Sequence, residues 1–331
     1  MINKNVLVSG GAGYIGSHTI LALLDKDYKI TVIDDMSTGS EQTKRYLESL
    51  GVEFILGNIN EIDRVKSIIK EKNIETVLNF AGSIIVGESV ENPVKYYENN
   101  FSNTLLFLKA CLDENIKRFV FSSTASIYGD ANNEPVTETS KVAPMNPYAE
   151  SKLMVEKALA DVKIAHPDFN YGILRYFNVA GADHKGRVGQ MSKDATHLIK
   201  VSTQKALKKR DSLEIFGTDY PTFDGTCIRD YIHISDLAQA HVNLVEYMEK
   251  NEKSNLFNCG YGDGFSVKQV ISELESIIGE SLNAKESPRR AGDPVSIVAN
   301  NAKIKTELGW KPKHNNLTEI ITSALEWEKT L

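Results

Sequence analysis

The run Asn5-Val6-Leu7-Val8-Ser9 leads directly into Gly10-Gly11-Ala12-Gly13-Tyr14-Ile15-Gly16, and this stretch decides the fold. The short apolar run is typical of a buried strand, and Ile15–Lys26 has the length and pattern of a helix. Glycines in the turn between them allow bare backbone to approach a pyrophosphate, toward which the helix N-terminus directs its N–H groups. The spacing satisfies both G-x-G-x-x-G and G-x-x-G-x-x-G, through Gly10, Gly11, Gly13 and Gly16.

A carboxylate follows at the distance that a dinucleotide site requires. Asp34 ends the next apolar run, 18 residues after Gly16. A carboxylate there accepts the hydroxyls of the adenosine ribose and repels a 2′-phosphate. The alternative is a glycine-rich turn that binds nothing, but the strand, the helix and the acid together favour a site for NAD rather than NADP.

Short apolar runs alternate with helical stretches through the first half of the chain. The expected strands are Asn5–Ser9, Lys29–Asp34, Val52–Leu56, Thr76–Phe80, Lys117–Ser123 and Tyr171–Tyr176. The expected helices between them include Ser40–Leu50, Ile62–Lys72, Val94–Glu114 and Pro147–Lys163. Strands that are apolar throughout and separated by helices predict a doubly wound parallel α/β sheet, which is Rossmann-like.

The pattern changes near residue 177, where Gly, Asp and polar residues become frequent. We therefore expect an NAD-binding domain over residues 1–176, to which about 231–255 return. Residues 177–230 and 256–331 are expected to form a smaller α/β lobe that binds the substrate.

Charge and cysteine content limit the partners. Among 331 residues, 38 Lys and Arg against 44 Asp and Glu give a net charge of -6, which argues against nucleic acid as a partner. No apolar run approaches the roughly 20 residues of a membrane helix, and no secretory leader is recognisable at the N-terminus. Three distant cysteines have neither metal-ligand nor disulfide spacing, so we expect no metal and a cytoplasmic location.

Tyr148 and Lys152 are the candidate proton-transfer pair. They are four residues apart in Pro147–Lys163, so they share one face of the expected helix. A lysine ammonium stabilises a phenolate and lowers the tyrosine pKa, which would let Tyr148 act as a base toward a sugar or alcohol hydroxyl. Thr124 follows a strand that ends at the carboxyl edge of the sheet, where it could relay the proton.

These features resemble the extended short-chain dehydrogenase/reductase superfamily, and further segments resemble its UDP-glucose 4-epimerase family. The matching segments span residues 4 to 312, nearly the whole chain. They include Phe80-Ala81-Gly82, Tyr96-Tyr97, Asn99-Asn100, Arg175-Tyr176-Phe177-Asn178, Gly225 to His233, and Pro288-Arg289-Arg290-Ala291-Gly292-Asp293.

The resemblance implies a set of cofactor contacts. It places Asn58 where the family often has Asp beside the adenine, and Phe177 near the nicotinamide. The residues implied to bind NAD are Gly10, Gly13, Tyr14, Ile15, Gly16, Asp34, Asn58, Ile59, Phe80, Ala81, Asn99, Tyr148, Lys152 and Phe177.

The resemblance also implies a UDP-sugar substrate and a homodimer. Arg229 and Arg290 would clamp the diphosphate, because a guanidinium matches phosphate oxygens and keeps its charge. In this family the position four residues after the substrate-binding Asp is a size gate beside the sugar 2-position, and here it is Ile297. The residues implied to bind substrate are Thr124, Tyr148, Asn178, Phe216, Arg229, Arg290, Asp293 and Ile297.

Three activities are compatible with these residues. The first is 4-epimerisation of UDP-glucose and UDP-galactose, with the N-acetylated pair as further substrates. The second is another NAD-dependent change to a nucleotide sugar; a 4,6-dehydratase needs carboxylates just after Thr124, where this chain has Ala125-Ser126. The third is a non-enzymatic NAD-sensing module, which has no need of the Tyr-Lys pair that this chain carries.

Overall fold

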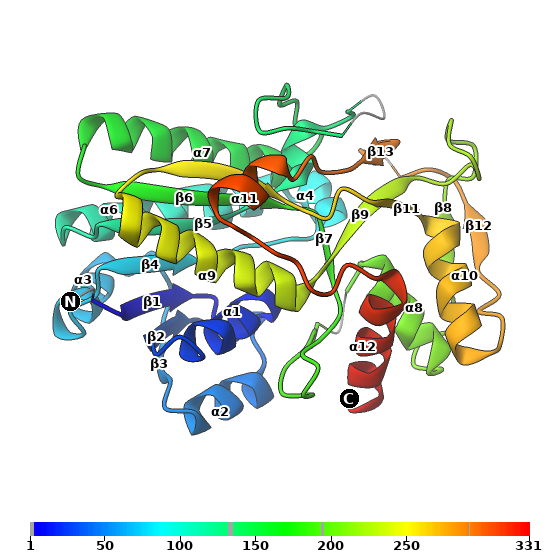
Figure 1. Cartoon of the computed structure of the whole chain (residues 1–331), viewed down its shortest axis with the longest axis horizontal. Coiled ribbons are helices and arrows are strands. Elements are labelled where there is room, and N and C mark those ends of the chain that lie inside the picture. The colour runs from blue at the N-terminus through cyan, green and yellow to red at the C-terminus, as the bar shows by residue number, and fades with distance from the viewer. Residues whose placement is uncertain (1–2, 132–134, 193–194, 291) are drawn as a thin grey trace. The chain divides into compact units, whose positions relative to one another are not determined.

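The computed structural model describes residues 3–131, 135–192, 195–290 and 292–331, and these residues form two compact units (Figure 1). Unit 1 comprises residues up to 127 together with 144–175 and 238–257. Unit 2 comprises 128–143, 176–237 and 258–331. No helix among the described residues is long and apolar enough to cross a membrane.

A seven-stranded sheet organises unit 1. In spatial order its strands are β10 (Asn255–Cys259), β6 (Asn170–Tyr176), β5 (Arg118–Thr124), β4 (Thr76–Asn79), β1 (Asn5–Ser9), β2 (Lys29–Asp34) and β3 (Glu53–Leu56). The β3–β2, β2–β1, β1–β4 and β4–β5 pairs are all parallel. The order runs outward in both directions from β1, which confirms the doubly wound α/β sheet expected from the sequence.

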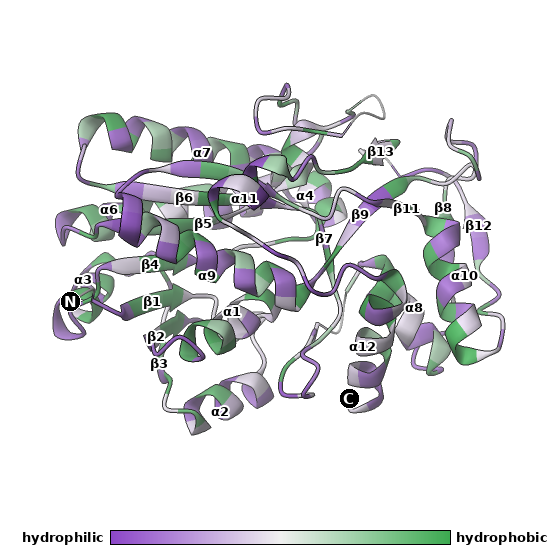
Figure 2. Ribbon diagram, in the orientation of Figure 1, coloured by the Kyte–Doolittle hydropathy of each residue, from purple (hydrophilic) through white to green (hydrophobic). Residues whose placement is uncertain are grey.

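Helices link the strands of this sheet. They are α1 (Tyr14–Leu24), α2 (Glu41–Ser49), α3 (Ile62–Glu71), α4 (Val86–Glu91), α5 (Pro93–Tyr96), α6 (Asn103–Asp113), α7 (Pro147–Ala165) and α9 (Ile234–Asn251). A π-helix, η1 (Tyr97–Ser102), joins α5 to α6, and a 3₁₀ turn, η2 (Ala125–Tyr128), follows β5. Figure 2 shows hydrophilic and hydrophobic residues side by side along α9, as expected of a helix with one buried face.

The main core of unit 1 lies between the sheet and the helices α3, α6 and α7. Leu7, Val77 and Phe119 contribute from the strands, and Phe107 and Leu159 from the helices, and all five side chains are fully buried. Continuous apolar strands are required here because the sheet is covered on both faces.

Unit 2 is built around β9 (Ile228–His233). This strand pairs in parallel with β7 (Asn178–Ala180) and β13 (Ser296–Ile297), and antiparallel with β11 (Gly264–Ser266). A separate parallel pair joins β8 (Glu214–Phe216) to β12 (Lys285–Ser287). The helices of this unit are α8 (Leu198–Ala206), α10 (Val267–Ile278), α11 (Ala302–Glu307) and α12 (Leu317–Lys329).

The unit boundaries differ from the expected ones in two longer segments, besides shifts of one or two residues at 176 and 256–257. Residues 128–143 belong to unit 2, because Val136 forms a parallel bridge with Ala299. Residues 231–237 also belong to unit 2, in which β9, up to His233, pairs with the described strands β7, β11 and β13. Long-range pairing of this kind has no local sequence signal.

The single helix expected over Val94–Glu114 is divided in the structure. The π-helical turn η1 interrupts it at Tyr97–Ser102. Asn100, fully buried within η1, donates from its side chain to the Ser83 carbonyl oxygen and the Ser151 hydroxyl. Such turns commonly mark functional positions, and this one holds the polar residues Asn99 and Asn100.

Candidate active site

The glycine turn has almost no space for side chains. A Cβ at Gly16 would lie 2.3 Å from the carbonyl oxygen of Gly10, and one at Gly10 would lie 2.7 Å from the Ala81 nitrogen. Gly10 also has a φ of +71°, which favours glycine. Gly13 is the N-cap of α1 and has an extended conformation, so the N-terminus of this helix, which favours an anion, begins at the glycine turn.

Asp34 is buried at the end of β2 beside this turn. Its carboxylate accepts the N–H of Ala12 at 2.9 Å and the N–H of Met36 at 2.9 Å. Burial raises the pKa of Asp34, and these two hydrogen bonds oppose the rise. Two uncharged backbone N–H groups thus orient the carboxylate, and no cation is needed to hold it. A carboxylate oriented in this way can accept hydrogen bonds from ribose hydroxyls.

Asn58, expected beside the adenine, and Ile59, expected to contact the cofactor, differ in accessibility. Asn58 is partly exposed; its amide donates to Asp35 at 2.9 Å, and its oxygen accepts the N–H of Asn60. Ile59 packs into the main core of unit 1, so only its backbone is available for a cofactor contact.

Phe80, Ala81 and Asn99 lie after β4 and on η1. The Phe80 N–H donates to the Ser9 carbonyl oxygen, which brings the two strand ends together. Asn99 donates to the Ser83 hydroxyl at 3.0 Å, and Asn100 accepts the Ser83 N–H at 2.7 Å. The family resemblance implies a role for Asn99 alone, whereas Asn100 holds this segment through the N–H and the carbonyl oxygen of Ser83.

Tyr148 and Thr124 are brought together by α7 and β5. Tyr148 is the second residue of α7, both side chains are buried, and they share a hydrogen bond. Burial raises the pKa of Tyr148, and the hydrogen bond to Thr124 opposes the rise. The net shift is opposite to the lowering expected from the lysine, because desolvation of a phenolate outweighs the other contributions.

Lys152 lies one turn further along α7 and is also buried. Its Nζ donates to the Ser122 carbonyl oxygen at 3.1 Å and lies 5.0 Å from the centre of the Phe121 ring. Burial lowers the pKa of Lys152 to about 8. The Ser122 carbonyl is a partner that the sequence did not reveal, since it depends on the packing of α7 against β5.

Unit 2 contains a separate group of cationic and aromatic residues. Arg229 on β9 and Arg290 both approach the Asp293 carboxylate, at 3.8 and 3.4 Å. The Arg290 guanidinium lies over the Phe216 ring, 4.2 Å from its centre. Arg229 is largely buried, whereas Arg290 is half exposed. The Asp293 carboxylate therefore holds one buried and one accessible guanidinium group. Ala291, in the same segment, lies outside the described residues.

The remaining expected substrate residues lie on strands that flank β9. Ile297 on β13 is the register partner of Arg229, and Asn178 on β7 is the register partner of Tyr231. Ile297 is buried, and so is Phe177, which immediately precedes β7.

A small cavity of about 20 Å³ adjoins Asn178 and Tyr231, and it is also lined by His197, Leu198 and Lys200. It has room for about one water molecule. Lys200 is buried in an ion pair with Glu328 and donates to the Gln190 carbonyl oxygen at 2.7 Å, so its charge has a structural partner.

The residues present in unit 1 fit an NAD molecule. The turn leads into a helix N-terminus, its glycines leave no room for side chains, and the Asp34 carboxylate accepts the N–H of Ala12 in the same turn.

Comparison with known proteins gives consistent matches. Residues 6–260 match the NAD dependent epimerase/dehydratase family. A UDP-glucose 4-epimerase of Azospirillum brasilense is 48% identical over 329 residues, which cover 99% of this chain and 93% of that protein. The UDP-glucose 4-epimerase of Bifidobacterium longum, solved with NAD+ and UDP, is 36% identical with a TM-score of 0.94 and 98% coverage of both chains. The UDP-Glc/GlcNAc 4-epimerase of Campylobacter jejuni is 44% identical with a TM-score of 0.86, covering 99% of this chain and 100% of that one.

The position of Asp34 predicts the cofactor preference. Asp34→Ala and Asp34→Asn should narrow the preference for NAD over NADP by about tenfold or more, because the 2′-phosphate no longer meets a carboxylate. Binding of both nucleotides is measured by titration calorimetry, with Asp25→Ala at the far end of α1 as the control. An unchanged preference in Asp34→Asn would contradict this role.

The lowered pKa of Lys152 predicts a dependence of stability on pH. Between about pH 8 and pH 10.5 the unfolded chain binds the Lys152 proton and the folded chain does not, so this residue makes stability rise with pH. Lys152→Met should lack this contribution. From pH 7.5 to pH 9.5, the free energy of unfolding of wild type should therefore rise by roughly 1–2 kcal/mol relative to that of Lys152→Met.

Urea unfolding at both pH values measures this difference. The matched control is Lys157→Met, an exposed lysine on the same helix. Parallel pH dependence of wild type and Lys152→Met would show that the pKa of Lys152 is not lowered.

Proposed function

Because the chain belongs to the NAD dependent epimerase/dehydratase family, we propose that it interconverts UDP-glucose and UDP-galactose by epimerisation at C4. The chain is an NAD-dependent isomerase, and several curated relatives named UDP-glucose 4-epimerase are 38–48% identical to it over almost its full length. The observation that carries the proposal is the buried Tyr148–Thr124 hydrogen bond with Lys152 one turn away, in the same unit as the glycine turn.

Tyr148 is the proposed acid and base. The glycine turn and Asp34 would hold NAD, which would supply a reversible hydride acceptor for the sugar C4. The Tyr148 phenolate accepts the proton of the 4-hydroxyl as the 4-keto sugar forms, and gives it back to the oxygen at C4 as the product forms. Thr124 donates a hydrogen bond that lowers the pKa of Tyr148. A protonated Lys152 one turn away is proposed to favour the phenolate in the same direction.

Arg229 and Arg290 are the proposed diphosphate ligands. Their common partner Asp293 fixes both guanidinium groups, and Phe216 orients Arg290 by stacking. Holding the nucleotide firmly allows the 4-keto sugar to turn without leaving, so that hydride returns to the opposite face. Binding energy from the nucleotide thus serves a reaction at the sugar.

The alternatives lack support from particular residues. A 4,6-dehydratase would need a carboxylate after Thr124, and the 3₁₀ turn there begins with Ala125 and Ser126. An NAD-sensing module would have no need of a buried lysine beside a buried tyrosine, since burying such groups is costly.

The proposal includes UDP-GlcNAc and UDP-GalNAc as substrates. Ile297 lacks the ring and hydroxyl of tyrosine, and as a β-branched residue it is stiff. The Campylobacter jejuni relative is described as acting on both UDP-Glc and UDP-GlcNAc.

A homodimer in the cytoplasm is also part of the proposal. All three cysteines are buried and unpaired, which suits a reducing compartment.

The test uses the purified chain with no nucleotide added. We expect bound NAD in the protein and interconversion of UDP-glucose and UDP-galactose. Net consumption of NADH in proportion to product would instead identify a reductase.

Tyr148→Phe should lower kcat by about 10²–10⁴, because it removes only the hydroxyl that moves the proton. Folding and NAD retention should be unchanged. Tyr46→Phe, on α2, is the control. Turnover near that of wild type would remove Tyr148 from the mechanism.

Ile297→Tyr should reduce turnover of the N-acetylated sugars selectively, because a ring at this position occupies the space beside the sugar 2-position. Turnover of UDP-glucose and UDP-galactose should be largely retained. The ratio of kcat/KM for UDP-GalNAc and UDP-galactose measures the effect, with Ile297→Leu as the volume-matched control. Equal loss on both sugars, or absence of N-acetyl activity in wild type, would contradict the gate.

A further inference from the structure

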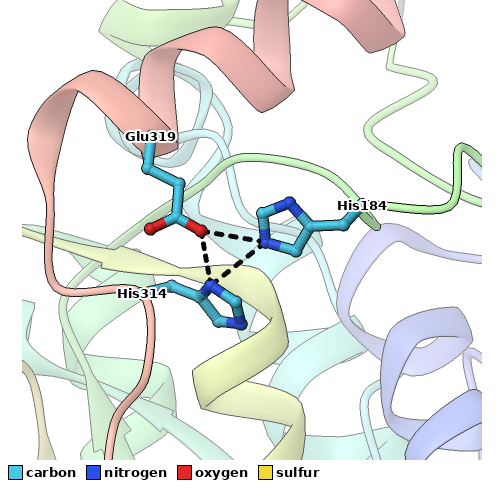
Figure 3. Close-up of side chains that lie close together, drawn as sticks. All are labelled: His184, His314 and Glu319. Atoms are coloured by element: carbon cyan, nitrogen blue, oxygen red, sulfur yellow. Dashed lines mark hydrogen bonds and ion pairs between the residues drawn. The ribbon is translucent and has the colours of Figure 1, made fainter.

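Two histidines and a glutamate, none of them assigned to NAD or UDP-sugar, meet in unit 2. His184 follows β7, His314 precedes α12, and Glu319 lies in the first turn of α12 (Figure 3). The His184 Nε2 lies 3.1 Å from the His314 Nδ1 and 3.3 Å from the Glu319 Oε1, and the last two atoms are 2.6 Å apart. All three side chains direct a ligand atom toward the same point.

The triangle of ligand atoms has the dimensions of one face of a zinc site. Zinc lies about 2.0–2.1 Å from imidazole nitrogen and about 2.0–2.2 Å from carboxylate oxygen, in tetrahedral geometry. Neighbouring ligand atoms of such a tetrahedron are about 3.3 Å apart. The two edges at His184 are close to this value, at 3.1 and 3.3 Å, whereas the His314–Glu319 edge is a hydrogen bond of 2.6 Å that would lengthen when an ion binds. An ion about 2.1 Å from all three atoms would lie about 1 Å outside their plane.

Separate hydrogen bonds hold each ligand in place. The backbone N–H of His314 donates to the buried Asp236 carboxylate at 2.8 Å. Glu319 has its own N–H bound to the Asn316 side chain that caps α12. The turn that carries His184 is closed by Asp183, which accepts the N–H of Lys185. Ligands positioned in advance lower the entropic cost of binding an ion.

The ring of His233 packs against the His184 side chain of this cluster. Its ring stacks on that of His184 at 4.8 Å with an angle of 3° between the planes. Its Nδ1 accepts the Ser235 N–H, so in the neutral ring the proton is on Nε2, which lies 3.1 Å from the Ser323 hydroxyl. His233 is therefore committed to these partners and orients His184 without serving as a ligand.

The cluster is accessible from outside. The side chains of His184 and Glu319 are 41% and 37% exposed, and a cavity of about 700 Å³ adjoins them. Solvent can thus reach the site and complete the coordination of an ion. Imidazole nitrogens select zinc and its neighbours in the first transition row, whereas magnesium and calcium prefer oxygen ligands.

We propose that His184, His314 and Glu319 form a zinc-binding site, with water in the fourth position, that ties the loop after β7 to the start of α12. The role is structural: an ion that binds only the folded chain stabilises unit 2. The three cysteines are buried and offer no competing thiolates to zinc in the folded protein.

The test is calorimetric titration of Zn²⁺ into the untagged full chain after dialysis against a chelator. We expect one Zn²⁺ per chain and a rise of several degrees in the midpoint of thermal unfolding on adding Zn²⁺. His184→Ala, His314→Ala and Glu319→Gln should each weaken binding by more than about tenfold. Mg²⁺ at the same concentration should have no such effect.

The controls are His166→Ala, an exposed histidine after α7, and Glu326→Gln, another acid beside the same cavity. Both should bind Zn²⁺ like wild type. Zn²⁺ binding that is equal in wild type, His184→Ala and His314→Ala would overturn the proposal, as would absence of binding to wild type. The variants could also be less stable than wild type by the same amount with and without Zn²⁺. That result would overturn the proposal and show that the cluster is only a hydrogen-bond network.

Discussion

The contact between Gly16 and the carbonyl oxygen of Gly10 is the constraint on which unit 1 depends. A Cβ at Gly16 would be 2.3 Å from that oxygen, so α1 can begin this close to β1 only because the residue is glycine. The close approach directs the N-terminus of α1 toward the carboxyl edge of the sheet, where Asp34 receives the Ala12 N–H. The close packing of the turn thus places the helix N-terminus and the Asp34 carboxylate at the same end of β1 and β2.

Burial governs the chemistry of the Tyr148 and Lys152 pair. It raises the pKa of the tyrosine and lowers the pKa of the lysine, so both groups are shifted toward their neutral forms. The Thr124 hydrogen bond acts on the tyrosine in the opposite direction. A site tuned in this way responds strongly to any positive charge placed beside it, because little water is present to screen that charge.

Strand β9 has a similar organising role in unit 2. Its residues Arg229, Tyr231 and His233 alternate in sequence and therefore share one face of the strand. They lie beside the Asp293 carboxylate, the small cavity at Asn178 and the histidine cluster, respectively. On the opposite face Asp230 is fully buried and accepts N–H groups from Tyr261, Gly262 and Ala299. Burial raises the pKa of Asp230 to about 6, and these three hydrogen bonds oppose the rise while they hold β9 to the neighbouring segments.

The sequence by itself determined the strand, turn and helix at residues 5–24, the carboxylate Asp34 and the shared face of Tyr148 and Lys152. These are local features, because a glycine spacing, a strand end and an i, i+4 pair are all set by neighbouring residues. Only the tertiary structure decided the direction of the Tyr148 pKa shift, since burial depends on segments distant in the chain. The same holds for the placement of residues 128–143 with unit 2 and for the π-helical turn around Asn100. The cluster of His184 with His314 and Glu319 joins residues more than a hundred positions apart. No spacing rule relates such residues, because the folding of β7 and α12 onto β9 alone brings them together.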